Sequence, residues 1–183
     1  MITKLTPALR LLILVVVTLM LMAGCNQADN AENSSTALGL EADKLAQQAA
    51  LSLPDLQLMT LEERPAHLSS YVGVPVVLNL WATWCPPCRR EMPVLEQAQA
   101  AFPDVAFVLI NQGESAQQAK AFLRSEGLNL KDVLLDPSSK AMQEMRTGGL
   151  PTTFLFDAQG RMVDLHLGEI TMSDLKDKIS RHF

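Results

Sequence analysis

The feature that most constrains this chain is a pair of cysteines two residues apart, placed where an apolar strand gives way to a helix. Val74 to Trp81 is typical of a buried strand, and Cys85 and Cys88 follow at the start of a helix expected over Pro86 to Ala101. At a helix N-terminus, unpaired N–H groups and the helix dipole favour a thiolate over a thiol. The pattern predicts a dithiol that cycles through a disulfide, with Cys85 as the exposed nucleophile and Cys88 as the buried resolving thiol.

A candidate acid-base group lies on the same helix. Glu91 comes three residues after Cys88 and therefore falls on the same helical face. A carboxyl group there can hold or deliver the proton of the resolving thiol, and its charge would raise the pKa of a nearby thiol. The alternative is a solvent-exposed helix residue paired with Arg89 or Arg90, and the residues by themselves leave both open.

These motifs together resemble the active site of the thioredoxin superfamily. More narrowly, they resemble the TlpA/ResA/DsbE branch of membrane-tethered thiol-disulfide oxidoreductases, which carries Trp-Cys-x-x-Cys followed by a Glu and a Pro, here Glu91 and Pro93. The resemblance runs from about Leu53 to the C-terminus. It implies a thioredoxin-like α/β fold, and the order of strands and helices also predicts a central mixed sheet with helices on both faces.

The resemblance also implies roles for residues outside the cysteine pair. Many thioredoxins carry a buried Asp where this chain has Asn79; since Asn cannot accept a proton, Glu91 becomes the better acid-base candidate, and Asn79 is equally well a hydrogen-bonded core amide. In thioredoxin-like folds the proline that corresponds to Pro151 is cis and faces the redox pair. The backbone of Leu150, which precedes it, is then open to an incoming peptide. The expected substrate-binding residues are Trp84, Pro86, Leu150 and Pro151.

Members of this branch mostly reduce disulfides of specific partner proteins, often apocytochrome c cysteines during cytochrome maturation. They receive electrons from a membrane thiol transporter of the DsbD or CcdA type. The resemblance therefore implies disulfide-bearing protein substrates and a membrane electron donor, with no cofactor beyond the dithiol. A dithiol outside the cytoplasm can also oxidise or isomerise, so the direction is less constrained than the chemistry.

The competing interpretation is a thioredoxin-fold protein that binds or delivers copper through the two cysteines. Such a protein usually has a wider cysteine spacing and a partner His, which this sequence lacks. A zinc site would need two further Cys or His ligands, and His67, His166 and His182 do not stand at ligand spacing. No metal site is therefore expected, and the family signal of a peroxide-reducing cysteine is also absent.

The first 24 residues have the pattern of a secretory signal. Lys4 and Arg10 precede 13 residues, 11–23, that are apolar except for one Thr. The segment ends Leu-Met-Ala-Gly before Cys25, which resembles a bacterial lipobox and implies lipidation of Cys25; the alternative is an uncleaved anchor with an incidental cysteine. We expect an extracytoplasmic, lipid-anchored protein, and Asn26 is compatible with the outer membrane.

The remaining chain divides into a polar tether over residues 25–50 and a thioredoxin-like domain over residues 51–183. The tether lacks periodicity and is poor in large apolar side chains. From Cys25 onward, 13 Lys and Arg stand against 20 Asp and Glu, a formal charge of −7. This balance, together with the absence of a basic patch, argues against nucleic acid as a partner.

Periodicity and turn residues predict the elements around the cysteine pair. An edge strand is expected over Leu53–Met59, and a charged turn over Leu61–Ala66. Ser115 and Thr171 are expected to begin helices. Met142 and Met145 are expected to pack in the core.

Overall fold

The structure is a computed structural model that describes residues 51–183. The predicted signal segment, the tether over residues 25–50 and the lipidation site Cys25 lie outside the described residues. Between residues 51 and 183, no helix combines the length and the apolar character needed to cross a membrane.

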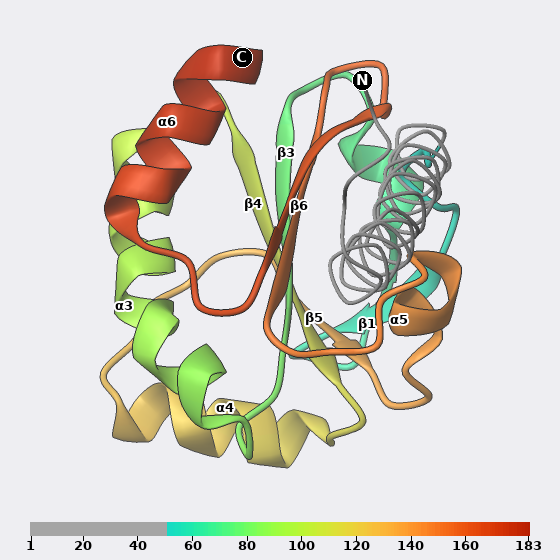
Figure 1. Ribbon diagram of the computed structural model, residues 1–183. Coiled ribbons are helices and arrows are strands. Elements are labelled where there is room, and N and C mark those ends of the chain that lie inside the picture. The colour runs from blue at the N-terminus through green and yellow to red at the C-terminus, as the bar shows by residue number, and fades with distance from the viewer. Residues whose placement is uncertain (1–50) are drawn as a thin grey trace, which may run out of the picture. The chain divides into compact units, whose positions relative to one another are not determined.

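A seven-stranded mixed sheet forms the centre of the fold (Figure 1), in the order β2-β1-β5-β4-β3-β6-β7. Strands β3, β4 and β5 run parallel to one another, and β6 runs antiparallel to β3. The strands span β1 Gln57–Thr60, β2 Pro65–His67, β3 Val76–Trp81, β4 Ala106–Gln112, β5 Val133–Asp136, β6 Thr152–Phe156 and β7 Met162–Leu167.

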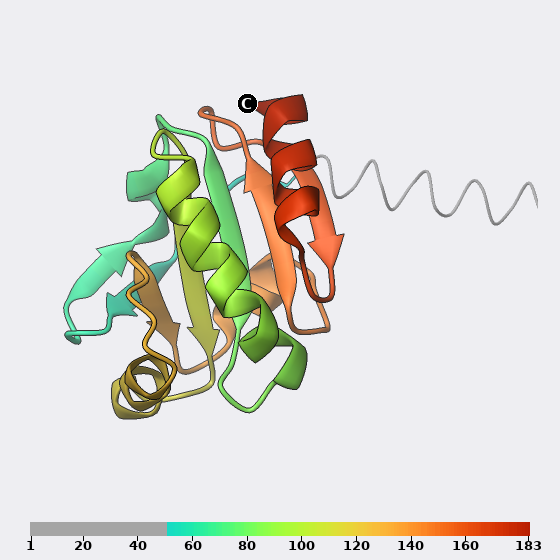
Figure 2. The same cartoon turned by 90° about the vertical axis from the view of Figure 1, so that its left-hand side faces the viewer.

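Helices cover both faces of this sheet, which confirms the predicted fold class. Side chains of α3, α4 and α6 pack with the core on one face, and α5 and the short 3-10 helix η1 pack on the other. Figure 1 shows the sheet edge-on between these layers, and Figure 2 shows α3 and α6 lying across the same face. The helices span η1 Leu68–Tyr71, α3 Pro86–Ala101, α4 Ala116–Ser125, α5 Lys140–Glu144 and α6 Met172–His182.

The helix starts follow from local sequence signals. Ser115 and Thr171 each cap a helix with a reciprocal capping box, as the sequence predicts. Helix α3 begins directly after Cys85 and continues through Pro93 to Ala101. Met145 is buried in the core on the α5 face, which confirms the packing role expected for it.

The prediction of the first strand was wrong in its place and bounds. Strand β1 covers Gln57–Thr60 and lies inside the sheet between β2 and β5. The edge is β2, which pairs antiparallel with β1 within the segment predicted as a turn. Pro65 starts this edge strand, a place that suits proline because an edge strand has a side that needs no N–H donor.

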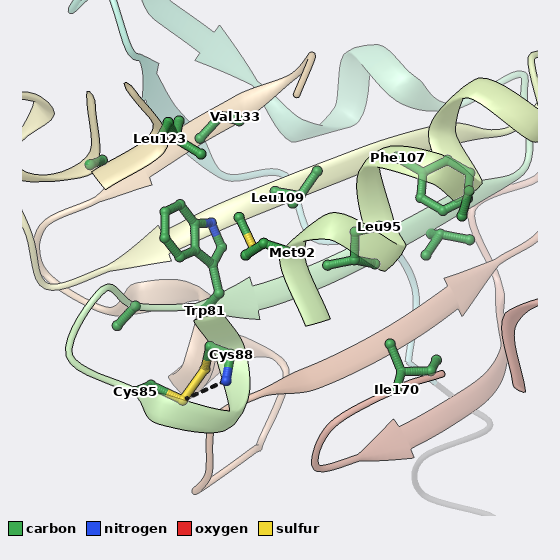
Figure 3. Packing of buried hydrophobic residues seen from close by; sticks show 14 of the residues in the cluster. Trp81, Cys85, Cys88, Met92, Leu95, Phe107, Leu109, Leu123, Val133 and Ile170 are labelled. Carbon is green, nitrogen blue, oxygen red and sulfur yellow. Dashed lines mark hydrogen bonds between the residues drawn. A yellow bond between two sulfur atoms is a disulfide. The ribbon is translucent and has the colours of Figure 1, made fainter. Parts of the chain in front are cut away.

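Strand β3 positions the active site because it is buried along its whole length. Val77 and Trp81 face the helices α3, α4 and α6, while Leu78 and Leu80 face the opposite core. The indole of Trp81 lies against the ring of Phe122 at a centroid distance of 5.6 Å. Figure 3 shows Trp81 and Met92 packed beside the cysteine pair, so the loop after β3 starts from the hydrophobic core.

Candidate active site

Cys85 and Cys88 form a disulfide at the N-terminus of α3, with their Cα atoms 5.3 Å apart. Cys85 is the N-cap residue, and its sulfur accepts a 3.3 Å hydrogen bond from the backbone N–H of Cys88 (Figure 3). Pro86 and Pro87 occupy the first helical positions, where a missing N–H costs nothing. Because the two prolines carry no N–H, the first donor of this helix end is the N–H of Cys88, and this donor and the helix dipole are directed at Cys85.

The two cysteines differ in access less than the sequence suggested. Cys85 is 3% exposed and Cys88 is fully buried. Cys85 is the more exposed of the two, as expected. The expectation that Cys85 is exposed is wrong for this disulfide form, because the surrounding core covers both cysteines.

Glu91 is buried and lies on the side of α3 that faces the sheet. Only 1% of the residue is exposed to solvent. Asn79 of β3 donates a 2.8 Å hydrogen bond to Oε1, and the backbone N–H of Ile170 donates a 2.8 Å hydrogen bond to Oε2. Asn79 also donates to the hydroxyl of Thr153 in β6. The carboxyl group therefore joins α3, the central strand and the segment before α6.

Burial raises the pKa of Glu91 from 4.5 to about 7. The hydrogen bonds from Ile170 and Asn79 favour the charged form and oppose this rise, and the charge of Glu169 adds to it. The shift places the titration of Glu91 near neutral pH, where a carboxyl group can both accept and release a proton.

The alternative of a solvent-exposed Glu91 paired with a neighbouring arginine is wrong. Arg89 pairs instead with Glu126 at 3.0 Å, and Arg90 pairs with Glu169 at 2.6 Å. Both ion pairs are exposed, while Glu91 has only uncharged hydrogen-bond partners.

The expected substrate-binding residues surround the same end of the sheet. The Leu150–Pro151 bond is cis. Thr152 pairs with Leu80, so Pro151 lies at the end of the sheet where β3 leads into the cysteine loop. Pro151 is buried, Leu150 is half-buried, and Pro86 is exposed. Trp84 is 67% exposed directly before Cys85.

A hollow of about 270 Å³ opens beside this proline. It is lined by the segment Met145–Thr152 and by residues of β6, β7 and the turn at Gly168. The backbone of Leu150 has no hydrogen-bond partner among residues 51–183, whereas the carbonyl of Pro151 accepts from Gly168 at 2.9 Å.

Sequence reasoning missed a second buried carboxylate near the cysteine loop. Glu114, in the loop that follows β4, accepts hydrogen bonds from the backbone N–H and the hydroxyl of Thr83. The available signal was its position: β3 and β4 are parallel neighbours, so residues following their carboxyl ends meet at one edge of the sheet.

Between residues 51 and 183, no group of three or more His, Cys, Asp or Glu side chains is arranged to hold a metal ion.

Comparisons with known proteins agree with this geometry. Residues 49–165 match the AhpC/TSA family. The thiol-disulfide oxidoreductase ResA of Geobacillus thermodenitrificans is 32% identical over 139 residues, covering 75% of this chain and 79% of that protein.

Two solved structures show the same fold. A DsbE-type thiol:disulfide interchange protein of Chlorobium tepidum has a TM-score of 0.66 at 27% identity and covers 73% of this chain and 96% of its own. The exposed lipoprotein thioredoxin Etrx1 of Streptococcus pneumoniae has a TM-score of 0.59 at 26% identity. The match covers 70% of this chain and 99% of the Etrx1 chain. With its Cys85–Cys88 centre, the chain belongs to the AhpC/TSA family, among the ResA/DsbE-like thiol-disulfide oxidoreductases of the thioredoxin superfamily.

Proposed function

We propose that this protein is a membrane-tethered, extracytoplasmic reductase of disulfides in specific partner proteins. The observation that carries the proposal is the buried carboxyl group of Glu91, one helical turn after Cys88 and titrating near pH 7. A dithiol that donates electrons must release two protons, and we assign the uptake of one of them to this group.

In the reduced enzyme, the thiolate of Cys85 attacks one sulfur of the partner's disulfide. A mixed disulfide forms, and the partner's other sulfur leaves as a thiolate. Cys88 then gives its proton to Glu91 and attacks the sulfur of Cys85. The bond between Cys85 and the partner breaks, the partner leaves fully reduced, and the enzyme keeps the Cys85–Cys88 disulfide.

The partner would bind across the end of the sheet that carries the disulfide. The open backbone of Leu150, next to Pro151, can pair with an extended segment flanking the partner's cysteines. Trp84 and Pro86, which flank Cys85 in the sequence, offer exposed apolar surface. We infer that apocytochrome c cysteines are one such substrate class, and that a membrane thiol transporter of the DsbD or CcdA type returns the electrons.

The tether is inferred from the lipobox-like segment that ends at Cys25. The name of the S. pneumoniae relative, an exposed lipoprotein, is consistent with such an arrangement. Lipidation of Cys25 would hold residues 51–183 on the extracytoplasmic side through the polar segment 25–50. Asn26 leaves outer-membrane placement open, although a donor in the inner membrane favours the inner membrane.

The direction of electron flow is tested by the reduction potential of the full chain in detergent, equilibrated with dithiothreitol and glutathione buffers. A reductase should lie near the thioredoxin value of about −270 mV, whereas an oxidant such as DsbA lies near −120 mV. A potential close to the second value would overturn the proposed reductase function.

A further inference from the structure

The carboxylate of Glu114 is built into the loop that precedes the redox pair. The residue is 5% exposed. Its Oε2 atom accepts hydrogen bonds from the backbone N–H of Thr83 at 2.8 Å and from the side-chain amide of Asn111 at 2.7 Å. Its Oε1 atom accepts from the hydroxyl of Thr83. Every partner of this carboxylate is an uncharged donor.

These contacts join two loops at one edge of the sheet. Asn111 pairs with Trp81 in the parallel register of β3 and β4, so Thr83 and Glu114 both lie just beyond the paired segment. Ser115, next in sequence, caps α4 and anchors the Glu114 side of the contact. Without the carboxylate, the partly buried N–H of Thr83 and the buried amide of Asn111 would lose their acceptor, which is costly for groups shielded from water.

The loop over Ala82–Trp84 depends on this contact for its shape. Among residues 51–183, the side-chain hydrogen bonds to this loop come from Glu114 alone. The other bond in the turn runs from the N–H of Cys85 back to the carbonyl of Ala82, at 3.2 Å. Trp84 itself projects into solvent. The position of Trp84 and the entry of the chain into Cys85 therefore depend on Thr83.

We propose that Glu114 is a positioning residue of the redox site, which fixes through Thr83 the loop that presents Trp84 and Cys85 to the partner's disulfide. This inference rests on the proposed attack by Cys85. It assigns Glu114 no proton transfer, and it separates the two buried carboxyl groups of the site: Glu91 serves the resolving step, and Glu114 serves the geometry of the first attack.

The hydrogen-bond pattern allows a variant that removes the charge and keeps the contacts. In Glu114→Gln, the amide oxygen can accept from the N–H of Thr83 and from Asn111, while the amide nitrogen donates to the hydroxyl of Thr83, which turns to accept. Glu114→Ala removes all three bonds. Thr83→Val removes only the hydroxyl. Matched controls outside the site are Glu62→Gln, at an exposed glutamate, and Thr60→Val in β1.

The experiment measures, on full-length protein in detergent, reduction of insulin and reaction of the reduced enzyme with 5,5′-dithiobis(2-nitrobenzoic acid). Temperature is set so that circular dichroism shows every variant folded. We expect Glu114→Ala to lose about tenfold or more in kcat/KM for insulin, since small misplacements of reacting groups are costly. The reagent 5,5′-dithiobis(2-nitrobenzoic acid) is small and needs no contact with Trp84. The rate at which Glu114→Ala reacts with it should therefore fall less, by about threefold. Glu114→Gln should stay within about threefold of wild type for both substrates.

The kcat/KM of Thr83→Val for insulin should lie between those of Glu114→Gln and Glu114→Ala. Adding Thr83→Val to Glu114→Ala should lower kcat/KM no further, because the hydroxyl has already lost its partner. A folded Glu114→Ala protein with wild-type insulin reduction would overturn the inference. A Gln variant as slow as the Ala variant would also overturn it, since charge would then matter and geometry would not. If Glu114→Ala does not fold, an unchanged rate in Thr83→Val overturns it. Turnover that persists in Cys85→Ser would instead defeat the proposed function, whatever Glu114 does.

Discussion

Asn79 of β3 donates a 2.8 Å hydrogen bond to Glu91 of α3, inside the core and next to the redox helix. The pair explains why a strand that is otherwise apolar carries an amide at this point. Asn79 can donate to a charged carboxylate, whereas an Asp in its place would put two acids side by side. Acid-base capacity is thereby confined to Glu91, and the amide holds that carboxyl group in position.

Replacing Glu91 with Gln should slow turnover and make Cys85 more acidic. Gln keeps the shape and can still accept from Asn79, but it cannot take the proton of Cys88 and carries no charge to oppose the thiolate. We expect turnover of a disulfide substrate to fall by about 100-fold, the lower range for loss of a general acid-base group. The pKa of Cys85, read from the pH dependence of alkylation, should fall.

Glu144→Gln, at an exposed position in α5, is the control for the loss of one carboxylate. It should leave both measurements unchanged. If Glu91→Gln also leaves the alkylation profile and turnover unchanged, the proposed role of Glu91 is wrong.

Glu91 should also make the stability of the protein depend on pH. Its pKa is about 7 in the folded protein and about 4.5 when exposed, so the unfolded chain releases this proton first as pH rises. The contribution of Glu91 to the free energy of unfolding is therefore complete below pH 4.5 and is lost as pH rises through about 7. The loss amounts to at most about 3 kcal/mol.

Urea unfolding of the disulfide form measures this effect without titrating thiols. Between pH 5 and pH 9, the free energy of unfolding of wild type should fall by up to about 3 kcal/mol more than that of Glu91→Gln. Parallel curves for the two proteins across this range would contradict a buried, proton-binding Glu91.

The part of the fold that local signals determine could be predicted from the sequence. Helix α3 has its predicted bounds because a capping cysteine, two prolines and a long helical pattern coincide there. Strand β3 could be predicted because a run that is apolar apart from Asn79 needs cover on both faces. The β1–β2 hairpin was misread because its strands are short, and the pairing of β1 with β5 far along the chain decides its place.

The same distinction explains the site. Cys85, Cys88 and Glu91 lie within one short segment at the start of α3, so their spacing predicted one helical face, and the family resemblance favoured a role for Glu91 in the site. Glu114 was missed because its contact with Thr83 spans 31 residues and exists only once β3 and β4 pair. The burial of Cys85 also depends on packing from other elements, which no local pattern reports.

Lipidation of Cys25 is expected from the lipobox-like end of the apolar segment. Mass spectrometry of protein extracted from membranes should show an acylated N-terminal cysteine. Cys25→Ser should release the protein from the membrane fraction or leave the signal uncleaved, while reduction of a soluble disulfide stays unchanged, because we expect Cys25 to take no part in the redox reaction. A mature chain that begins at Met1, or a disulfide between Cys25 and Cys85, would sink this prediction.

Partner proteins should be trapped by a Cys88→Ser variant and not by Cys85→Ser. The reason is the position of Cys85 at the N-cap of α3, where the thiolate is favoured, together with the complete burial of Cys88. With Cys88 replaced, the mixed disulfide at Cys85 has no resolving thiol and persists.

The measurement is non-reducing electrophoresis of the reduced variants after exposure to oxidised apocytochrome c, with mass spectrometry of the cysteine peptide. The double variant Cys85→Ser/Cys88→Ser is the matched control and should form no adduct. Adducts in Cys85→Ser with none in Cys88→Ser would reverse the two roles, because attack would then begin from the buried thiol. Adducts in neither variant, with an insulin disulfide trapped normally, would retain the chemistry and remove apocytochrome c from the partners.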